Sequence, residues 1–388
     1  MARLGPWDGA RRVALAVSGG PDSLALALLA KAWGDPVAFI VDHRLRAASG
    51  AEAQAARTTL LDRGIPTTVL VLDNLTHGPG LASRARVARY AALTKACREA
   101  GLVDLLLGHH AGDQAETVLM RRRRGSGPFG LAGMAALTET LDLRLLRPLL
   151  AATPNELRAL VDAAGLVPAD DPSNTDARST RVALRREIGA DRAELLGCAA
   201  KAAQDRATAE RAVAAELAER ASLYPEGYAV LSPGQVSPAA LSALIRSVSG
   251  QPYAARTDAL AAAPQAATLG GTRLQPAGQA GPGWLVTREE RAFEAPVQAL
   301  PGAVWDGRFR VAGGRPDSEI GALGAGSASL RRLTDLPSTV LRALPAIRTA
   351  GLLVATPHIG YLAPGKGIPG LMVRSGTLPA AGAAFLAC

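Results

Sequence analysis

Cysteine is nearly absent from this 388-residue chain, which has only Cys97, Cys198 and Cys388 and no C-x-x-C pair. This scarcity argues against a disulfide scaffold, an iron–sulfur site and a cysteine-built zinc site. The chain also lacks a run of eighteen uncharged apolar residues, so we expect no membrane span. Its first residues show no apolar core of a signal peptide, and we therefore expect a cytoplasmic protein.

Lysine is scarce too, and it occurs only as Lys31, Lys95, Lys201 and Lys366, although lysine and arginine together number 43. Nearly all of the positive charge is therefore arginine, and the formal net charge is +9. Guanidinium groups match phosphate oxygens better than ammonium groups do. The charge thus suits a polyanionic partner, but it gives no location for one.

Short apolar runs alternate with longer helical stretches between about residues 12 and 150. We expect strands at Val13–Val17, Pro36–Val41, Thr67–Leu72 and Val103–Leu107, and helices at Ser23–Trp33, Ala51–Gly64, Leu81–Ala100 and Gly112–Arg124. This alternation predicts an α/β fold with a doubly wound parallel sheet, which binds ligands at the carboxyl ends of its strands.

The amino-acid composition of the sequence changes twice after this region. An Ala-rich stretch from about Asp191 to Arg220 has no Gly or Pro after Gly197, which predicts a long linker helix. Gly and Pro punctuate the chain beyond Tyr224, where we expect a smaller α+β region. The predicted domains are a catalytic domain at 1–190, a helical linker at 191–223 and a C-terminal region at 224–388.

The stretch Ser18-Gly19-Gly20-Pro21-Asp22-Ser23 joins the first expected strand to the first expected helix. A helix start following a strand presents free backbone N–H groups and favours phosphate. The stretch is not a Walker loop, because it lacks the lysine, and it lacks the third glycine of a dinucleotide fingerprint. The alternative is a plain turn in which Ser18 or Asp22 caps the helix.

A second polar stretch follows the last of these expected strands. Asp113 and Glu116 are three residues apart, so on a helix they share a face that looks back toward the phosphate loop. Two carboxylates beside phosphates suit Mg²⁺; the alternative is a solvated acid pair favoured by the helix dipole. His109 and His110 lack the H-E-x-x-H spacing and the cysteine partners that would indicate zinc. Asp42 and His43 end the second expected strand at the same edge.

Two groups of arginines are candidates for binding nucleic-acid phosphates. The first is Arg121, Arg122, Arg123 and Arg124, before a Gly-Ser-Gly loop; the alternative is a helix end that complements the dipole. The second is Arg178, Arg181 and Arg185, which share one face of a helix opened by Asp171-Pro-Ser-Asn174. The alternative for these is pairing with nearby Asp residues.

These motifs, in this order, resemble the tRNA(Ile)-lysidine synthase family of N-type ATP pyrophosphatases. The family's pyrophosphate loop is S-G-G-x-D-S, which matches Ser18–Ser23. The other matching motifs are Val41-Asp42-His43 with Leu45-Arg46, Ala85-Arg86 with Ala88-Arg89-Tyr90, His109-His110 with Asp113–Thr117, Arg124–Pro128 with Gly130–Met134, Arg147–Leu150, and Asp171–Asn174 with Asp176 and Arg181. The resemblance covers about residues 12–190.

The resemblance implies a Rossmann-like PP-loop domain that uses ATP and Mg²⁺, and a C-terminal region at 224–388 that binds tRNA. The implied reaction adenylates C2 of the wobble cytidine in the CAU anticodon of an isoleucine tRNA, and free L-lysine then displaces AMP to give lysidine. The implied ATP site is Ser18, Gly19, Gly20, Pro21, Asp22, Ser23, Asp42 and His43; the implied catalytic residues are Asp22, Asp113 and Glu116, with Asp113 on Mg²⁺. The residues that clasp lysine, and whether the protein is a homodimer, stay open.

Two positions depart from the family pattern: Gly112 stands where an acid is usual, and Val182 where Asn is common. The first leaves Asp113 to hold the metal, with Asp22 as a second candidate. Three other functions are weighed against the synthase: a PP-loop tRNA thiolase, a non-catalytic RNA-binding protein and a dinucleotide oxidoreductase. The missing cysteine pair disfavours the first, the intact loop the second, and the missing glycine the third.

Overall fold

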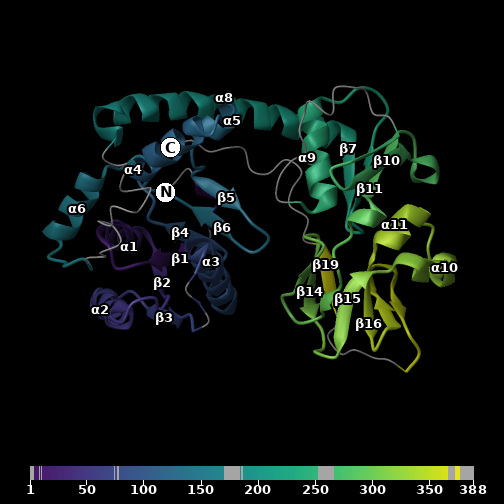
Figure 1. The fold of residues 1–388 in the computed structure, drawn as a ribbon, viewed down its shortest axis with the longest axis horizontal. Helices are drawn as coiled ribbons and strands as arrows, with labels where there is room; N and C mark the ends of the chain where they lie inside the picture. The colour runs from purple at the N-terminus through teal and green to yellow at the C-terminus, as the bar shows by residue number, and fades with distance from the viewer. Residues whose placement is uncertain are drawn as a thin grey trace. The chain divides into compact units, whose positions relative to one another are not determined.

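The structure is a computed structural model, and it describes residues 4–7, 9, 11–73, 75–76, 78–169, 184, 187–251, 266–365 and 372–375 (Figure 1). These residues form two compact units, which divide between Thr208 and Ala209. That division lies inside one helix, so the domain limits expected at residues 190 and 223 remain a prediction. No helix within the described ranges has both the length and the apolarity to cross a membrane.

The first unit contains a six-stranded sheet in the order β3-β2-β1-β4-β6-β5, and only the β5–β6 pair is antiparallel. Its strands are β1 (Arg12–Val17), β2 (Asp35–Asp42), β3 (Thr67–Val71), β4 (Asp104–Leu107), β5 (Leu137–Glu139) and β6 (Arg144–Leu146). Its helices before the long one are α1 (Pro21–Trp33), α2 (Ser49–Leu61), α3 (Leu81–Glu99), α4 (Ala111–Arg123), α5 (Pro128–Leu131) and α6 (Pro154–Ala163). The α/β expectation is confirmed, while β5, β6, α5 and α6 were not expected.

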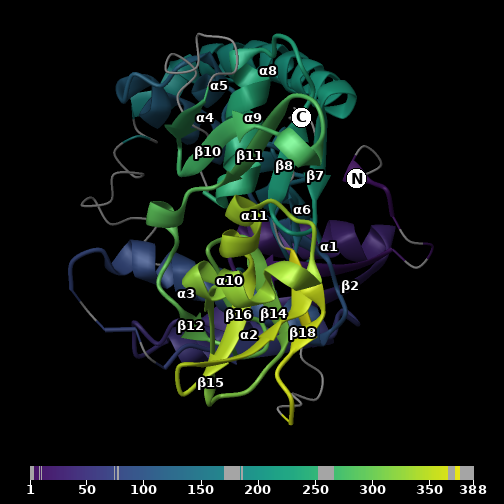
Figure 2. The same ribbon diagram turned by 90° about the vertical axis from the view of Figure 1, so that its right-hand side faces the viewer.

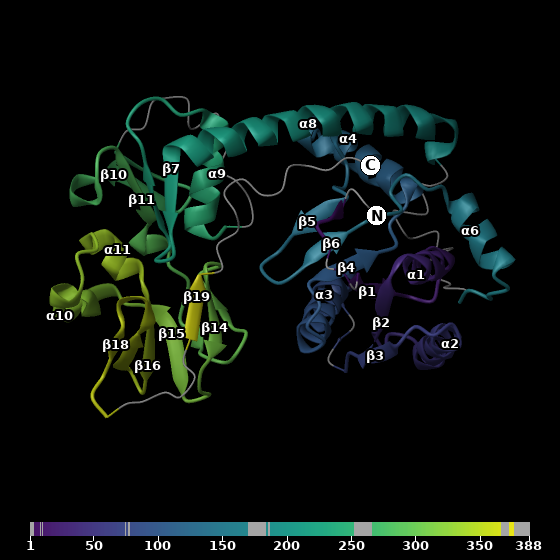
Figure 3. The same ribbon diagram turned by 180° about the vertical axis from the view of Figure 1, so that it is seen from behind.

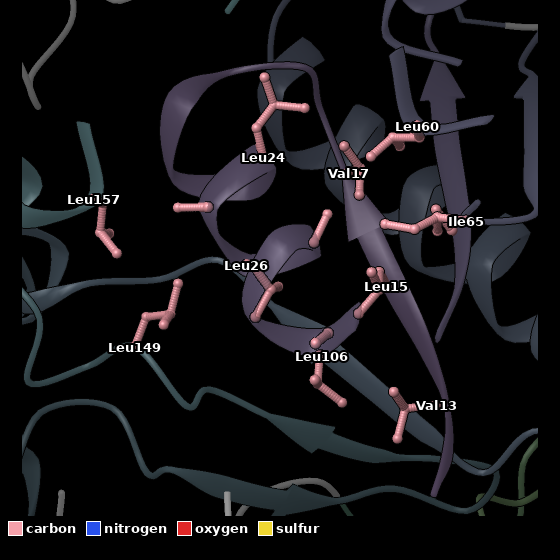
Figure 4. Packing of buried hydrophobic residues seen from close by; sticks show 14 of the residues in the cluster. Val13, Leu15, Val17, Leu24, Leu26, Leu60, Ile65, Leu106, Leu149 and Leu157 are labelled. Atoms are coloured by element: carbon pink, nitrogen blue, oxygen red, sulfur yellow. The ribbon is translucent and has the colours of Figure 1, made fainter. Parts of the chain in front are cut away.

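Helices cover both faces of this sheet. Strand β1 carries apolar side chains on both of its sides, and such a strand is stable only when both sides are buried. Val13, Leu15 and Val17 alternate with Ala14, as the period of a strand requires. The first three pack against α1, α2 and α6, as Figure 4 shows for Leu24, Leu60 and Leu157 among others. Ala14 belongs to the opposite core, which α3 supplies with Leu93 and Cys97. In Figures 1 and 3 the strands accordingly lie between α1 and α2 on one side and α3 on the other.

The strand order reverses at β1, which pairs with β2 on one side and with β4 on the other, both in parallel. The chain leaves β1 toward α1 and leaves β4 toward α4. In sheets of this kind ligands bind in the crevice outside the carboxyl ends of the two strands at the reversal. The sequence after these two strands contains Ser18–Ser23 and His109–Glu116.

The expected long helix is present as α8 (Arg192–Arg220), after a short 3₁₀ turn at Gly189–Asp191. Its first turns bury Leu195 and Ala199 against Ala115, Val118 and Leu119 of α4, beside which it lies in Figure 3. The helix that carries the predicted acids is thus held by apolar packing against α8 and by hydrogen bonds from Ala111 and Gln114 to the backbone of Ala152 and Met134.

The second unit begins with a five-stranded antiparallel sheet in the order β7-β8-β11-β10-β9. Its elements are β7 (Ala221–Tyr224), β8 (Tyr228–Leu231), α9 (Pro238–Ser249), β9 (Ala267–Leu269), β10 (Thr272–Pro276) and β11 (Trp284–Arg288), with 3₁₀ turns at Gly278–Ala280 and Glu290–Ala292. Figure 2 shows α9 beside β8, β10 and β11, where Leu244 and Ile245 enter the core with Ala229, Leu274 and Val286.

Two further antiparallel sheets follow in this unit, in the orders β12-β15-β16-β17-β18 and β13-β14-β19. Trp305, Phe309 and Val311 of the smaller sheet pack against Ile320 and Ile347 of the larger. The elements are β12 (Val297–Gln298), β13 (Val304–Trp305), β14 (Phe309–Gly313), β15 (Ser318–Ala322), α10 (Ser327–Leu330), α11 (Ser338–Ala343), β16 (Pro345–Thr349), β17 (Leu352–Thr356), β18 (Tyr361–Leu362) and β19 (Met372–Ser375), with 3₁₀ turns at Gly324–Gly326, Arg331–Leu333 and Pro357–Ile359.

Three buried charged side chains of the second unit, Arg288, Asp306 and Arg308, form an ion triad that also binds the backbone of two turns. Asp306 accepts hydrogen bonds from Arg288 Nε at 3.0 Å and from Arg308 Nε at 2.8 Å. The two arginines also donate to the carbonyl oxygens of Gly271 and Gly227. Burial lowers the pKa of Arg308 to about 10, although Asp306 opposes that shift. The triad therefore depends on the single central carboxylate for its charge balance.

We expect Asp306→Ala to lower the free energy of unfolding by about 3–5 kcal/mol, because two buried guanidinium groups lose their counter-charge. Asp317→Ala is the matched control, since the Arg315–Asp317 pair is half exposed and such pairs contribute about 0–1 kcal/mol. Denaturant titration of both variants measures the difference. Equal losses would show that the triad adds nothing beyond an exposed pair.

Candidate functional site

Hydrogen bonds of two serines fix the backbone conformation of the loop between β1 and α1. Ser23 Oγ donates to the carbonyl oxygen of Gly20 at 2.9 Å and accepts from Ser18 N–H at 3.2 Å. Gly19 has φ +86°, a conformation that a residue with a side chain rarely adopts. Gly20 is the N-cap of α1, and no side chain caps that helix. The plain capped turn is therefore wrong, and the helix start is a ready site for an anion.

The junction after β4 packs directly against this loop. A Cβ on Gly108 would lie 3.3 Å from the carbonyl carbon and oxygen of Asp22 and from Cα of Ser23. A side chain at position 108 would be crowded by the backbone of α1, and glycine allows this close approach without strain. The first turn of α1 and the start of α4 therefore meet at the crevice between β1 and β4.

His110 is the N-cap of α4 and fixes how the acids are presented. Its Nδ1 accepts from the N–H groups of Gly112 and Asp113, at 3.0 and 3.3 Å. Its own N–H donates to Asp113 Oδ2 at 3.1 Å, which completes a capping box. Because Nδ1 is an acceptor, the neutral ring carries its hydrogen on Nε2. That atom lies 3.5 Å from Asp22 Oδ2 and 3.8 Å from Asp113 Oδ2.

Asp22 and Asp113 are therefore brought together around one imidazole nitrogen. No group of three or more His, Cys, Asp or Glu residues that could hold a metal occurs among the residues described. Mg²⁺ does not need such a group, because it takes one or two carboxylates and completes its shell with waters and substrate phosphates. The pair of carboxylates beside an anion site fits that donor set. Glu116 lies one turn further along α4 and is 2% exposed.

The acid missing at position 112 has a steric explanation. A Cβ on Gly112 would lie 2.7 Å from Cε1 and 3.0 Å from Nδ1 of His110. Those distances are shorter than any ordinary contact, so a side chain there requires the ring to move. In this chain the ring of His110 occupies the space that the Cβ atom of an acidic residue at position 112 would need.

Asp42 lies at the same edge but is occupied within the protein. Its Oδ1 accepts from Ser49 Oγ at 2.7 Å and from Arg44 N–H at 2.9 Å. Burial raises the pKa of Asp42, but these hydrogen bonds and the charge of Arg44 outweigh it and the net pKa is lowered. The carboxylate therefore shapes the connection between β2 and α2, and a direct role with ATP stays a prediction, as it does for His43.

A group of arginine and histidine side chains lies near this edge, and sequence reasoning assigned a role to only one of its members, His43, in the ATP site. The group, which we call the arginine–histidine cluster, consists of His43, Arg86, Arg89, Tyr90, His109 and Arg147. Arg86 and Arg89 lie 5.0 and 5.4 Å from the ring of Tyr90. The motifs with Arg86, Arg89 and Arg147 were visible in the sequence, but only the fold brings them together.

This cluster holds half of the buried polar side-chain atoms without a hydrogen-bond partner in the described part of the chain. They are Nδ1 of His43 and His109, Nε of Arg89 and Arg147, and the Tyr90 hydroxyl. Burial, against the opposing charge of Asp113 and together with the charges of Arg147, Arg89 and Arg86, lowers the pKa of His109 to about 4. His109 is therefore uncharged at neutral pH. Buried polar atoms without partners are costly, which indicates a surface built to receive a polar ligand.

The four consecutive arginines divide into different roles. Arg121 Nη1 donates to the carbonyl oxygens of Gly130 and Gly133, at 2.8 and 2.7 Å. Arg122 lies 3.8 Å from Glu194, and Arg123 pairs with Glu187. Arg124 is the C-cap of α4 and is exposed. Arg122 and Arg123 are exposed too, and the binding of the four arginines to tRNA stays a prediction.

The second predicted group, Arg178, Arg181 and Arg185, lies outside the described residues. The described chain approaches it at Ala169, whose N–H donates to the carbonyl oxygen of Gly19 at 3.0 Å. Ala169, the last described residue before the Asp171-Pro-Ser-Asn174 motif, thus lies beside the phosphate loop.

Comparison with known proteins identifies a matching family and several similar proteins. The profile of a family described as a PP-loop domain matches residues 2–191. The tRNA(Ile)-lysidine synthase of Ruegeria pomeroyi is 34% identical over 381 residues, which cover 90% of this chain and 89% of that protein. The synthase of Novosphingobium aromaticivorans is 47% identical over 211 residues, 53% of this chain and 64% of that protein.

One solved structure has a weaker similarity. It is the U34-tRNA thiolase NcsA from Methanococcus maripaludis with its [4Fe-4S] cluster, with a TM-score of 0.41 and 21% identity. The match covers 48% of this chain and 67% of that one. A similarity this low does not bear on the chemistry of the site.

Proposed function

The chain belongs to the tRNA(Ile)-lysidine synthase family, and on this premise we propose that it ligates free L-lysine to C2 of the wobble cytidine in the CAU anticodon of an isoleucine tRNA. The observation that carries the proposal is the match over 90% of the chain to the Ruegeria pomeroyi relative. The reaction forms a carbon–nitrogen bond and converts ATP to AMP and pyrophosphate. Adenylation of the C2 oxygen comes first, and the lysine amine then displaces AMP.

The first step needs ATP held with its pyrophosphate end at a fixed anion site. ATP binding follows from the PP-loop domain. We assign the pyrophosphate to the N–H groups at the start of α1, which no side chain caps. Donors already fixed in place stabilise charge that develops on the leaving pyrophosphate without reorganising during the reaction.

We assign Asp22 and Asp113 to Mg²⁺, because their carboxylates converge on His110 Nε2 beside this loop. Bound there with the phosphates, Mg²⁺ would neutralise part of their charge. The contribution of the chain itself is orientation: His110 caps α4 and hydrogen-bonds Asp113 through its backbone N–H. The carboxylates are thus positioned before substrates arrive.

The second step needs a place for lysine and for the anionic groups left at the adenylated base. We assign the anionic groups, the α-phosphate and the lysine carboxylate, to Arg86, Arg89 and Arg147 of the arginine–histidine cluster. Two of these arginines have a buried Nε without a partner. Since His109 is uncharged at neutral pH, the lysine ammonium meets the acids of α4 without an opposing imidazolium.

A sulfur-inserting reaction is less well supported, because the described cysteines are unsuited to it. Burial raises the pKa of Cys97 to about 12, so it stays a thiol at neutral pH. Cys198 is exposed on α8 and distant in sequence from any other cysteine. The chain offers no cysteine pair comparable to a cluster-binding motif.

Nucleoside mass spectrometry tests the proposal directly. Isoleucine tRNA with a CAU anticodon is incubated with the protein, ATP, Mg²⁺ and lysine, and is then digested. We expect lysidine in place of the wobble cytidine, and none when ATP or lysine is omitted. A thiolated nucleoside, or an unmodified cytidine with all components present, would overturn the proposal.

A further inference from the structure

Phe129 is the most exposed aromatic side chain in the described residues, with 50% of its surface accessible. Aromatic residues make up only 4% of the chain, and the other described ones are buried or partly buried except Tyr224, which stacks on Tyr228. An exposed phenyl ring forgoes the free energy that burial would supply. Among the described aromatic side chains it is the one most accessible to a partner.

The short turn α5 that carries Phe129 is held firmly. Arg121 Nη1 donates to the carbonyl oxygens of Gly130 and Gly133. Gln114 donates to the Met134 carbonyl oxygen at 2.9 Å and accepts from Met134 N–H at 2.7 Å. Arg206 of α8 donates to the carbonyl oxygen of Phe129 itself at 3.4 Å. Three polar side chains thus hold the backbone of α5 and of the segment that follows it, so the fold fixes the backbone position from which the Phe129 side chain projects.

The surroundings of the ring favour an anionic partner. Arg206 lies directly at the Phe129 backbone, and the exposed Arg124 precedes the loop Gly125-Ser126-Gly127 that leads into α5. A Cβ on Gly125 or Gly127 would meet nothing within 4 Å, so the loop leaves open space. A flat apolar ring beside guanidinium groups is the combination that binds an unpaired nucleobase and its phosphates.

The ring is distant from the reacting groups. After α4 the chain turns back, so that α5 lies beside Arg121, whose Nη1 donates to the carbonyl oxygen of Gly130. Arg121 is eight residues after Asp113 on α4, which at a rise of 1.5 Å per residue is about 12 Å along the helix axis. A base stacked on it is therefore a different base from the cytidine that reacts at the phosphate loop.

We propose that Phe129 is a stacking platform for an unpaired nucleobase of the tRNA substrate, at a nucleotide other than the wobble cytidine. This inference rests on the proposed function for the identity of the RNA. Phe129 is then a positioning residue: it fixes where the anticodon arm lies relative to the phosphate loop. A protein–protein contact is disfavoured, because a stable interface buries about 800 Å² on each partner and here a single ring lies among glycines and arginines.

Four variants test the proposal through the Kd for unmodified tRNA and the KM values for tRNA and ATP. We expect Phe129→Ala to raise the Kd and KM for tRNA about 5- to 150-fold, the range for loss of one base–aromatic stack, with the KM for ATP unchanged. Phe129→Trp should bind as wild type does, and Phe129→Leu should resemble Phe129→Ala. Val103→Ala is the control, because Val103 is 60% exposed and precedes β4, at the amino ends of the parallel strands.

The outcomes separate the inference from the proposed function. Wild-type affinity in Phe129→Leu would show an apolar contact without stacking, and an effect no larger than that of Val103→Ala would remove the inference while lysidine formation still stands. A change in oligomeric state with unchanged tRNA affinity would identify a protein contact and overturn it. If the wild type makes no lysidine but Phe129→Ala loses affinity for tRNA, the proposed function fails and the stacking platform stands.

Discussion

Replacing Asp22 by asparagine is expected to lower the rate of AMP formation by about two orders of magnitude or more, because a charge beside the transferring phosphates is lost. Asn has nearly the same shape, and Asp22 is only partly buried and caps no helix. The fold should therefore persist. The rate of pyrophosphate release, measured with tRNA and lysine present, gives the effect, and denaturant titration checks that the free energy of unfolding is unchanged.

The matched control for this variant is Asp35→Asn. Asp35 is an exposed aspartate of the same unit that lies 3.8 Å from Arg12, where β1 and β2 begin. The carboxyl ends of these strands, and hence the phosphate loop, lie at the opposite edge. Its turnover should equal that of the wild type. Wild-type turnover in Asp22→Asn as well would remove Asp22 from the ATP site.

The α/β architecture could be predicted because its signals are local. β1 and β4 are short runs of mostly apolar residues, and neither α1 after its first turn nor α8 after Gly197 contains Gly or Pro, so patterning alone indicated them. β5 and β6 have three residues each, too few for a periodic pattern. Their pairing depends on contacts with β4, which no local rule predicts.

The site was predictable in part for the same reason. The phosphate loop and the acids of α4 each lie within one contiguous motif, and the rule for parallel sheets placed both at one edge. The arginine–histidine cluster instead draws on segments that follow β2, begin α3, follow β4 and follow β6. Its members share no spacing in the sequence, so only the folded chain brings them together.

Two local details were also beyond sequence reasoning. His110 caps α4 through Nδ1, although the residues preferred at that position are Ser, Thr, Asp and Asn. Arg121 belongs to a run of four arginines, yet it donates to two backbone carbonyl oxygens within its own unit. In both cases a side chain with an expected role at the site supports the backbone that presents other residues.

The second large effect is expected for Asp113→Asn. With the negative charge removed, adenylation should fall by about two orders of magnitude at millimolar Mg²⁺ and should need more Mg²⁺ to reach half its maximum. The amide oxygen of Asn can still accept the hydrogen bond from His110 N–H that closes the capping box of α4. The affinity for tRNA should change little, because Asp113 contributes no positive charge to phosphate binding.

Glu156→Gln separates the role of Asp113 at the metal from its role at the helix start. Glu156 occupies the equivalent position in the capping box of α6, where it accepts from Thr153 N–H at 2.7 Å. Both variants therefore remove one charge from a capping box, but only one lies beside the phosphate loop. We expect a Mg²⁺ titration of pyrophosphate release to shift for Asp113→Asn and to coincide with the wild-type curve for Glu156→Gln. Coincident curves for all three proteins would contradict the metal assignment, since a purely structural role of Asp113 predicts that result.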